Sequence, residues 1–149
     1  MLTYNQILKR IQQLCVHHAQ VKSYKYARPT DFLTEKTTEF TAVFLQDNDG
    51  NVSISSKQQT INFKLFVLDL VNVSEDTLTN LKDVQSDTLE IAKDLIALFN
   101  DENYTDWAIG SECNFQLLFE AFDALVAGVV VDFSIRVPYL SDRCAVPLY

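Results

Sequence analysis

Glycine and histidine are scarce in this sequence, and their scarcity excludes several classes of function. The 149 residues include three glycines and two histidines, and the histidines, His17 and His18, are adjacent. A phosphate-binding loop needs several glycines at fixed spacing, so nucleotide hydrolysis is excluded. Nucleophilic catalysis needs a Ser or Cys beside a His and an orienting acid, and no serine lies in a G-x-S-x-G elbow. We therefore predict that the protein is not an enzyme and has no catalytic residues.

Basic side chains are also few. Lys and Arg number 12 against 20 Asp and Glu, which gives a formal net charge of −8. A surface that binds nucleic acid tightly needs clustered Lys and Arg, so such a surface is not expected. An acidic surface is compatible with a protein that DNA slides past, because it repels the phosphate backbone.

The three cysteines and the apolar runs indicate the compartment. Cys15, Cys113 and Cys144 are odd in number and far apart, which favours reduced thiols in a cytosolic compartment. No window approaches the roughly 20 apolar residues that a membrane-spanning helix needs. The N-terminus lacks the pattern of a signal peptide. We predict a protein that is neither secreted nor embedded in a membrane.

Two patterns resemble metal sites but are incomplete. Cys15 and His18 have the spacing of two zinc ligands on one helical face, but a zinc site needs four. The segment Asp47–Asn51 has its glycine at position four, and Gln58 stands where a calcium loop has its Glu. We predict neither metal nor cofactor, and we interpret Asp47–Asn51 as a hairpin turn.

The chain as a whole has the composition of one globular domain, residues 1–149. Apolar residues make up 48% and charged residues 21% of it, enough to bury one core. Thr3 and Gln6 fit a capping box that opens a helix ending at about His18–Gln20. Ser74–Asp76 predicts the start of a long second helix, or of two collinear helices, ending near Asn100.

Runs rich in β-formers predict about five strands between and after these helices. The second half of Gln59–Val71 is apolar on both faces, and Val129–Val137 alternates cleanly until Pro138. This order predicts an α+β fold with a mostly antiparallel sheet and both helices on one face. The predicted strands are Val21–Tyr26, Phe40–Leu45, Gln59–Val71, Cys113–Phe119 and Val129–Val137.

The tail after the last strand has no period of its own. Residues 139–149 carry Tyr139 and Tyr149, and tyrosines are frequent in protein interfaces. We expect this segment to lie over the domain or to reach a neighbouring molecule.

The C-terminal half resembles small tail proteins of tailed bacteriophages. The resemblance rests on Phe115–Phe119, on the stretch Asp123–Val129, on the strand VVVDFSIRVP and on the ending Cys144–Pro147. In those proteins a D-x-L-A-G turn leads into a final strand, and a short tail with a C-x-x-P ending follows. The order of elements is similar to that of tail-terminator, tail-completion and head–tail connector proteins.

The resemblance implies a structural protein of the virion, assembled in the host cytoplasm. It would form a ring of about six or twelve copies, next to portal, connector or tail proteins, with DNA passing through without specific binding. The candidate lumen or docking loop is Asp47, Asn48, Asp49, Gly50 and Asn51. The candidate inter-subunit arm includes Tyr139, Leu140, Cys144, Pro147 and Tyr149.

One alternative belongs to a different class. A soluble acidic adaptor or inhibitor could use the same negative surface to bind a basic protein. An adaptor needs one binding surface, whereas a ring subunit needs two different and complementary ones.

Overall fold

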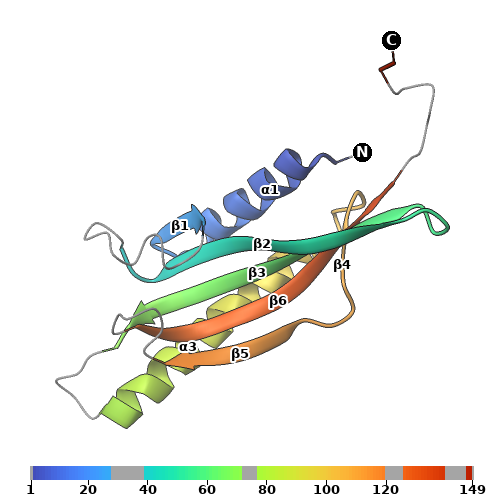
Figure 1. The fold of residues 1–149 in the computed structure, drawn as a ribbon. Coiled ribbons are helices and arrows are strands. Elements are labelled where there is room, and N and C mark those ends of the chain that lie inside the picture. Colours follow the sequence, from blue (N-terminus) through green and yellow to red (C-terminus); the bar gives the residue numbers. More distant parts are fainter. Residues whose placement is uncertain (1, 28–38, 72–76, 120–125, 140–146, 149) are drawn as a thin grey trace.

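The computed structural model describes residues 2–27, 39–71, 77–119, 126–139 and 147–148. Figure 1 shows one sheet with two helices on the same side of it. The elements are α1 (Tyr4–His17), β1 (Ser23–Tyr26), β2 (Ala42–Ser53), β3 (Gln58–Leu70), α3 (Thr77–Phe99), β4 (Ala108–Ile109), β5 (Asn114–Phe119) and β6 (Val126–Pro138). The predicted α+β fold is confirmed.

The sheet has six strands and a mixed pairing. Its order is β1-β2-β3-β6, and both β5 and β4 pair with the outer side of β6. All pairs are antiparallel except β1 with β2, where Ser23 lies opposite Ala42 and Tyr26 opposite Leu45. The prediction of about five mostly antiparallel strands omitted the parallel pair and the two-residue strand β4.

The predicted capping box opens α1. The Gln6 amide donates to the Thr3 hydroxyl at 3.3 Å, and the Thr3 amide donates to the Gln6 side chain at 2.9 Å. Two amides that lack partners within the helix are thereby satisfied. The helix ends at His17, one residue before the predicted range. The long second helix is confirmed as one continuous element, and its predicted start, Ser74–Asp76, lies outside the described residues.

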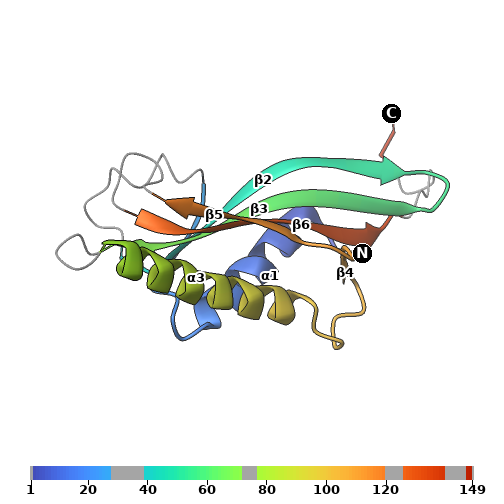
Figure 2. The ribbon, with the colours of Figure 1, turned by 90° about the horizontal axis from the view of Figure 1, so that it is seen from below.

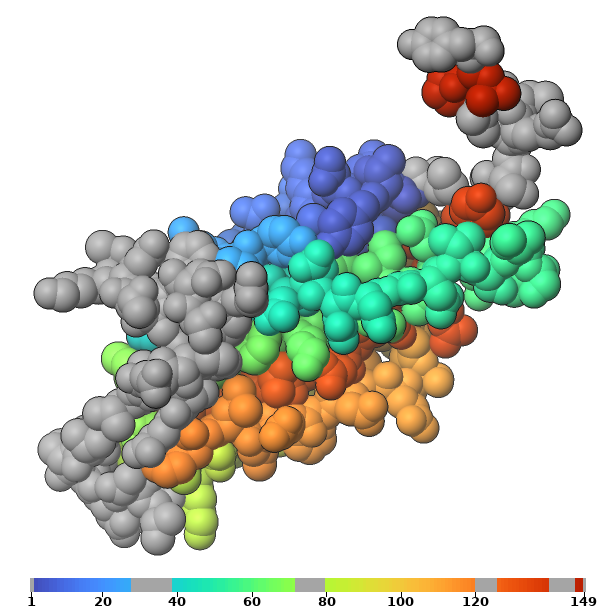
Figure 3. Space-filling model, viewed as in Figure 1, coloured from blue at the N-terminus to red at the C-terminus, as the bar shows by residue number. Residues whose placement is uncertain are grey.

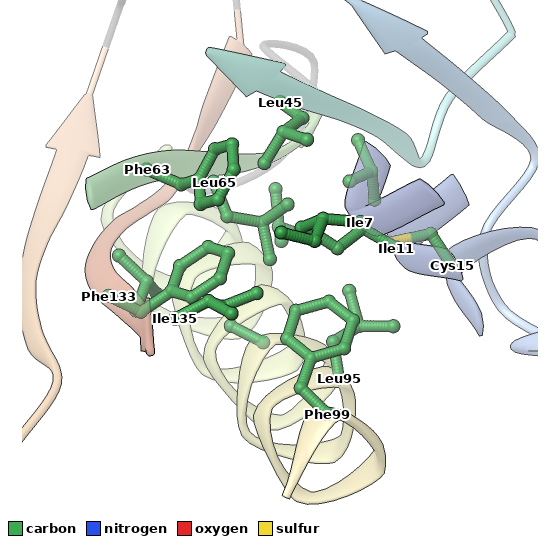
Figure 4. Close-up of a cluster of buried hydrophobic side chains, with 14 of the residues drawn as sticks. Ile7, Ile11, Cys15, Leu45, Phe63, Leu65, Leu95, Phe99, Phe133 and Ile135 are labelled. Atoms are coloured by element: carbon green, nitrogen blue, oxygen red, sulfur yellow. The ribbon is translucent and has the colours of Figure 1, made fainter. Parts of the chain in front are cut away.

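The main core lies between the sheet and the two helices (Figures 2 and 4). The ring of Phe133 stacks on Phe63 at 5.5 Å between centroids and meets Phe99 of α3 at 5.4 Å. Ile7, Ile11 and Cys15 of α1 are buried in the same cluster. Burying such side chains contributes about 1.5–3 kcal/mol each, so this layer stabilises the fold most.

The opposite face of the sheet is apolar over its middle. Phe66 and Leu68 of β3 are buried there with Ala42, Phe44 and Val126. The prediction that the second half of β3 is buried on both faces is confirmed. Along β6, the predicted alternation is confirmed as well, because Val129 through Val137 are buried at every second position.

Gly128 is required where β6 passes β3. A Cβ at this position would overlap the carbonyl oxygen of Val67 and lie 3.0 Å from the Cα of Leu68. Gly128 pairs with Leu68 on one side and with Leu118 of β5 on the other. The glycine therefore lets three strands approach closely at the centre of the sheet.

The prediction of a turn at Asp47–Asn51 is wrong. These residues belong to β2, and the hairpin turn consists of Ile54–Lys57. Asp47 pairs with Phe63 and Gly50 with Ile61, so Asn48 and Asp49 together face Asn62 in a β-bulge. Asn and Gly are favoured in bulges as well as turns, and here the long partner strand β3 kept the segment extended.

The tail is described only in part. The amide of Tyr139 donates to the carbonyl of Lys57 at 2.8 Å, which places the start of the tail beside the β2–β3 turn. Leu148 is 80% exposed, and Pro147 is exposed as well. Leu140, Cys144 and Tyr149 of the predicted arm lie outside the described residues, as does the beginning of the stretch Asp123–Val129.

Candidate assembly surface

The margin of the sheet formed by β5 is an open strand edge. On its inner side β5 pairs with β6 from Asn114–Asp132 to Phe119–Ala127, and no strand of the described chain pairs with its outer side. Open edges present unsatisfied N–H and C=O groups to any strand that approaches. In Figure 3, β5 (orange) runs along the lower margin of the molecule.

One face of β5 carries a row of exposed apolar side chains. Phe115 is 57% exposed, and Leu117 and Phe119 are each 46% exposed. They pair with Val131, Val129 and Ala127 of β6, so they lie on the helix side of the sheet. Between Asn114 and Phe119 there is no charged residue. The edge thus lacks the charges by which proteins protect strand edges from association.

An apolar groove separates this row from α3. It has a volume of about 160 Å³. Its lining is apolar except for Lys93, whose ammonium contacts Glu90 at 2.8 Å. The lining residues are Leu89, Ala92, Lys93, Ile96, Cys113, Phe115 and Val131.

The groove exists because α3 does not cover the full width of the sheet. Val84, Ile91, Leu95 and Phe99 of α3 are buried, whereas Leu89 and Ile96 on the β5 side are only partly covered. The helix thus packs over β3 and β6, and β5 projects beyond it (Figures 1 and 2). Gln85 reaches from α3 to donate to the carbonyl of Leu118 at 3.2 Å, which ties β5 to the helix.

Cys113 is a free thiol in the groove wall and is half-buried. Burial raises the pKa of this thiol. Cys15, in contrast, is fully buried in the core, where burial raises its pKa to about 12. A zinc ligand must be a thiolate, so the environment of Cys15 does not favour metal binding. His18, the other half of that pattern, contacts Asp94 at 2.9 Å.

The residues predicted as a lumen or docking loop form a different surface, the distal half of β2. Asp47, Asn48, Asp49, Gly50 and Asn51 are all exposed. They line a groove of about 500 Å³ beside the start of α1. Their outer edge has no strand partner among the described residues, because β1 pairs only with Ala42–Leu45.

Hydrogen bonds hold this acidic segment in place. The Tyr4 hydroxyl donates to Asp47 at 3.3 Å and lies 3.2 Å from the hydroxyl of Tyr26. Burial, with the bonds to Tyr26 and Asp47, raises the pKa of Tyr4. Asn62 donates to Asp49 at 2.6 Å across the bulge. The two aspartates are thus oriented by neighbours that carry no positive charge.

A cluster around Arg10 joins α1 to the segment before β4. Arg10 donates two hydrogen bonds to Asp106, at 2.8 and 2.9 Å, and lies 4.5 Å from the ring centre of Tyr104 and 4.8 Å from that of Trp107. The bond from Arg10 holds the pKa of Asp106 below its usual range. Trp107 is buried and donates to the carbonyl of Phe99 at 2.9 Å. This cluster fastens the segment before β4 to α1 and α3.

Sequence reasoning missed the β5 groove. The alternation of Cys113, Phe115, Leu117 and Phe119 is typical of a buried strand face, and nothing in it marks an edge. The available signal was the absence of charged residues on either face of this strand. Two other predicted strands could form the centre of the sheet and leave this one at its edge. No three metal-binding side chains gather in the described part of the chain.

Comparison of the sequence with models of known protein families and with curated proteins finds no match. None of the helices in the described part of the chain is long and apolar enough to span a membrane.

Proposed function

We propose that this chain is a structural subunit of a tailed phage virion that forms a closed ring at the head–tail junction or the tail end. One observation carries the proposal: the sheet has two open edges of different character. The β5 edge is apolar and uncharged, and the distal β2 edge carries Asp47 and Asp49. A monomeric protein would be expected to protect both edges.

The two strand edges suit two different roles in the proposed ring. The β5 edge suits contact with another subunit, since exposed apolar rows mark interaction sites. The distal β2 segment suits the channel wall, because its carboxylates repel phosphates and provide no base-specific contacts. The net charge of −8 is in keeping with a channel through which DNA must pass without sticking.

The proposed ring has about six or twelve copies. Its neighbours would be portal, connector or tail proteins, and its site of assembly the host cytoplasm. The arm of residues 139–149 is proposed as a second contact between subunits. Two observations support this role of the arm. The arm begins at Tyr139, which lies beside the β2–β3 turn at a projecting end of the molecule, and Leu148 is exposed.

Native mass spectrometry of the purified protein over a range of concentrations tests the proposal. We expect one discrete species of about six or twelve subunits, with a central channel in electron micrographs. Monomers at every concentration would contradict the ring and favour an acidic adaptor that uses only the distal β2 surface. A dimer that grows no further would contradict the ring as well.

A further inference from the structure

The open margins of the described sheet differ in how well they suit the apolar edge of β5. The margin of β1 carries Lys25, and the distal half of β2 carries Asp47 and Asp49. The strand β4 has two residues, too few for a ladder. The strand β5 has six residues, no charge and a regular register with β6. A charge packed against an apolar row loses water without gaining a partner, so among these edges β5 is matched best by β5 itself.

The apolar row of β5 is symmetric about its middle residue. Phe115, Leu117 and Phe119 alternate along the helix side of the strand, with Leu117 at the centre. Two identical strands can pair antiparallel about a two-fold axis, and residues directly opposite each other then lie on the same face. With the axis at Leu117, this residue faces its own copy, and Phe115 faces Phe119 of the partner subunit. Every exposed side chain of the row thus meets an apolar one.

We propose that two copies of this chain join by antiparallel pairing of their β5 strands about a two-fold axis at Leu117. The main-chain groups on the open side of β5 supply the new ladder. The axis is perpendicular to the sheet, so the two sheets become one continuous sheet with the helices of both copies on the same side. As a contact of the proposed ring the pair rests on that function, but its geometry is tested separately.

The same pairing covers the groove between α3 and β5. Phe115 lines that groove, and the ring of Phe119 of the partner subunit comes to lie beside it on the same face. The groove volume of about 160 Å³ is close to that of an apolar cavity that holds benzene. The side chain of Lys93 is 61% exposed and bonded to Glu90, so its ammonium stays in water while its stem packs at the rim.

The row is small for an interface that acts alone. Its side chains are about half exposed, and a fully buried phenylalanine removes about 150–250 Å² from water. The row therefore buries roughly 300 Å² per copy before the main chain is counted, against about 800 Å² per partner in a standard interface. The pair is a weak complex that a second contact completes, and in the proposed ring that contact is the arm of residues 139–149. A ring built from pairs has an even number of copies.

Disulfide formation at the axis tests the pairing. The starting protein carries Cys113→Ser and Cys144→Ser, which leaves the fully buried Cys15. Leu117→Cys then places a thiol on the axis, where opposite Cβ atoms lie about 4.5–5.5 Å apart and a disulfide can close after a small movement. Under a mild oxidant such as copper phenanthroline, we expect most of the protein to become covalent dimer. A contact of β5 with any other edge would keep these two thiols apart.

Two matched controls use the same background. Val52→Cys on the distal half of β2 has nearly the exposure of Leu117, 47% against 46%, and should give little covalent dimer. Phe115→Cys lies on β5 but off the axis, with its copy about 14 Å away along the strand, and should also give little. If either control gave as much covalent dimer as Leu117→Cys, the pairing would be overturned. Circular dichroism should show all three variants folded.

Native mass spectrometry of the same samples before oxidation separates the pairing from the ring. Rings that give no disulfide at Leu117→Cys, or that contain an odd number of copies, would overturn the pairing and leave the ring standing. Dimers that grow no further, joined by that disulfide on oxidation, would support the pairing and overturn the ring. Monomers at every concentration, with no more disulfide than the controls, would overturn both.

Discussion

The β5 edge and the distal half of β2 are both strand edges without a strand partner among the described residues, but they differ in chemistry. On β2, the aspartates Asp47 and Asp49 and a β-bulge interrupt the edge. On β5, six regularly paired residues carry no charge, and Phe115 is 57% exposed. Charges and bulges are the devices that keep strand edges from associating. The difference indicates that β2 is kept free and that β5 is left available for a partner.

The largest expected effect comes from making β5 resemble β2. Leu117→Lys puts a charge into the exposed row, where an interface would have to bury it without a partner. We expect loss of assembly by a hundredfold or more, since an unpaired buried charge costs about 3 kcal/mol or more. Analytical ultracentrifugation measures the association.

The matched control for that change is Asn51→Lys on the distal β2 edge, which is exposed and already polar. It should leave assembly within about twofold of the wild type. Circular dichroism should show both variants folded, because Leu117 is 46% exposed in the single subunit. Normal assembly of Leu117→Lys would remove β5 from the proposed interface.

A second prediction compares the distal half of β2 with the centre of the sheet, by the tolerance of one glycine in each. Gly128→Ala forces a methyl group into the main chain of Val67 at the centre of the sheet, and should lower the free energy of unfolding by about 3 kcal/mol. Gly50→Ala brings a Cβ to 2.6 Å from the carbonyl oxygen of Thr60. It should cost about 1 kcal/mol, because the distal strand can shift toward solvent. Urea unfolding measures both, and equal losses would show that the distal β2 segment is as rigidly held as the centre.

The smallest expected effect concerns the Arg10 cluster, which fastens the segment before β4, the other strand on the outer side of β6. The pKa of Asp106 is lowered in the folded state, so its pair with Arg10 stabilises the protein above about pH 4. That contribution is lost as the pH falls below 4 and the carboxylate takes up a proton. Asp106→Asn should therefore cost less than about 1 kcal/mol at pH 7, because the side chain is 43% exposed and screened by solvent.

Thermal unfolding between pH 3 and pH 7 measures the difference in stability between the wild type and Asp106→Asn. The gap between wild type and Asp106→Asn should close toward pH 3. Glu102→Gln, an exposed carboxyl group in the same loop, serves as the control and should show no such trend. A gap that stays constant across the pH range would show that Asp106 acts through packing and not through its charge.

Much of the fold could be predicted because its elements have strong local patterns. The capping box of Thr3 and Gln6 and the alternation of Val129–Val137 depend on neighbours in sequence, and both are confirmed. The turn at Asp47–Asn51 could not be judged locally, because the same residues suit a turn and a bulge. The length of the pairing strand β3 decided between them. The parallel pairing of β1 with β2 likewise leaves no local mark.

The sequence by itself determined the α+β class, the acidic surface and the apolar character of the strand Asn114–Phe119, since these follow from composition and periodicity. Only the tertiary structure decided which apolar faces are covered. Leu65 and Val131 lie under the helices and are buried, whereas Phe115 and Leu117, with the same alternation, lie beyond the edge of α3. Burial depends on where α3 crosses the sheet, and that position results from the packing of the whole core. The candidate assembly surface is therefore a property of the fold and cannot be located by the pattern of any one segment.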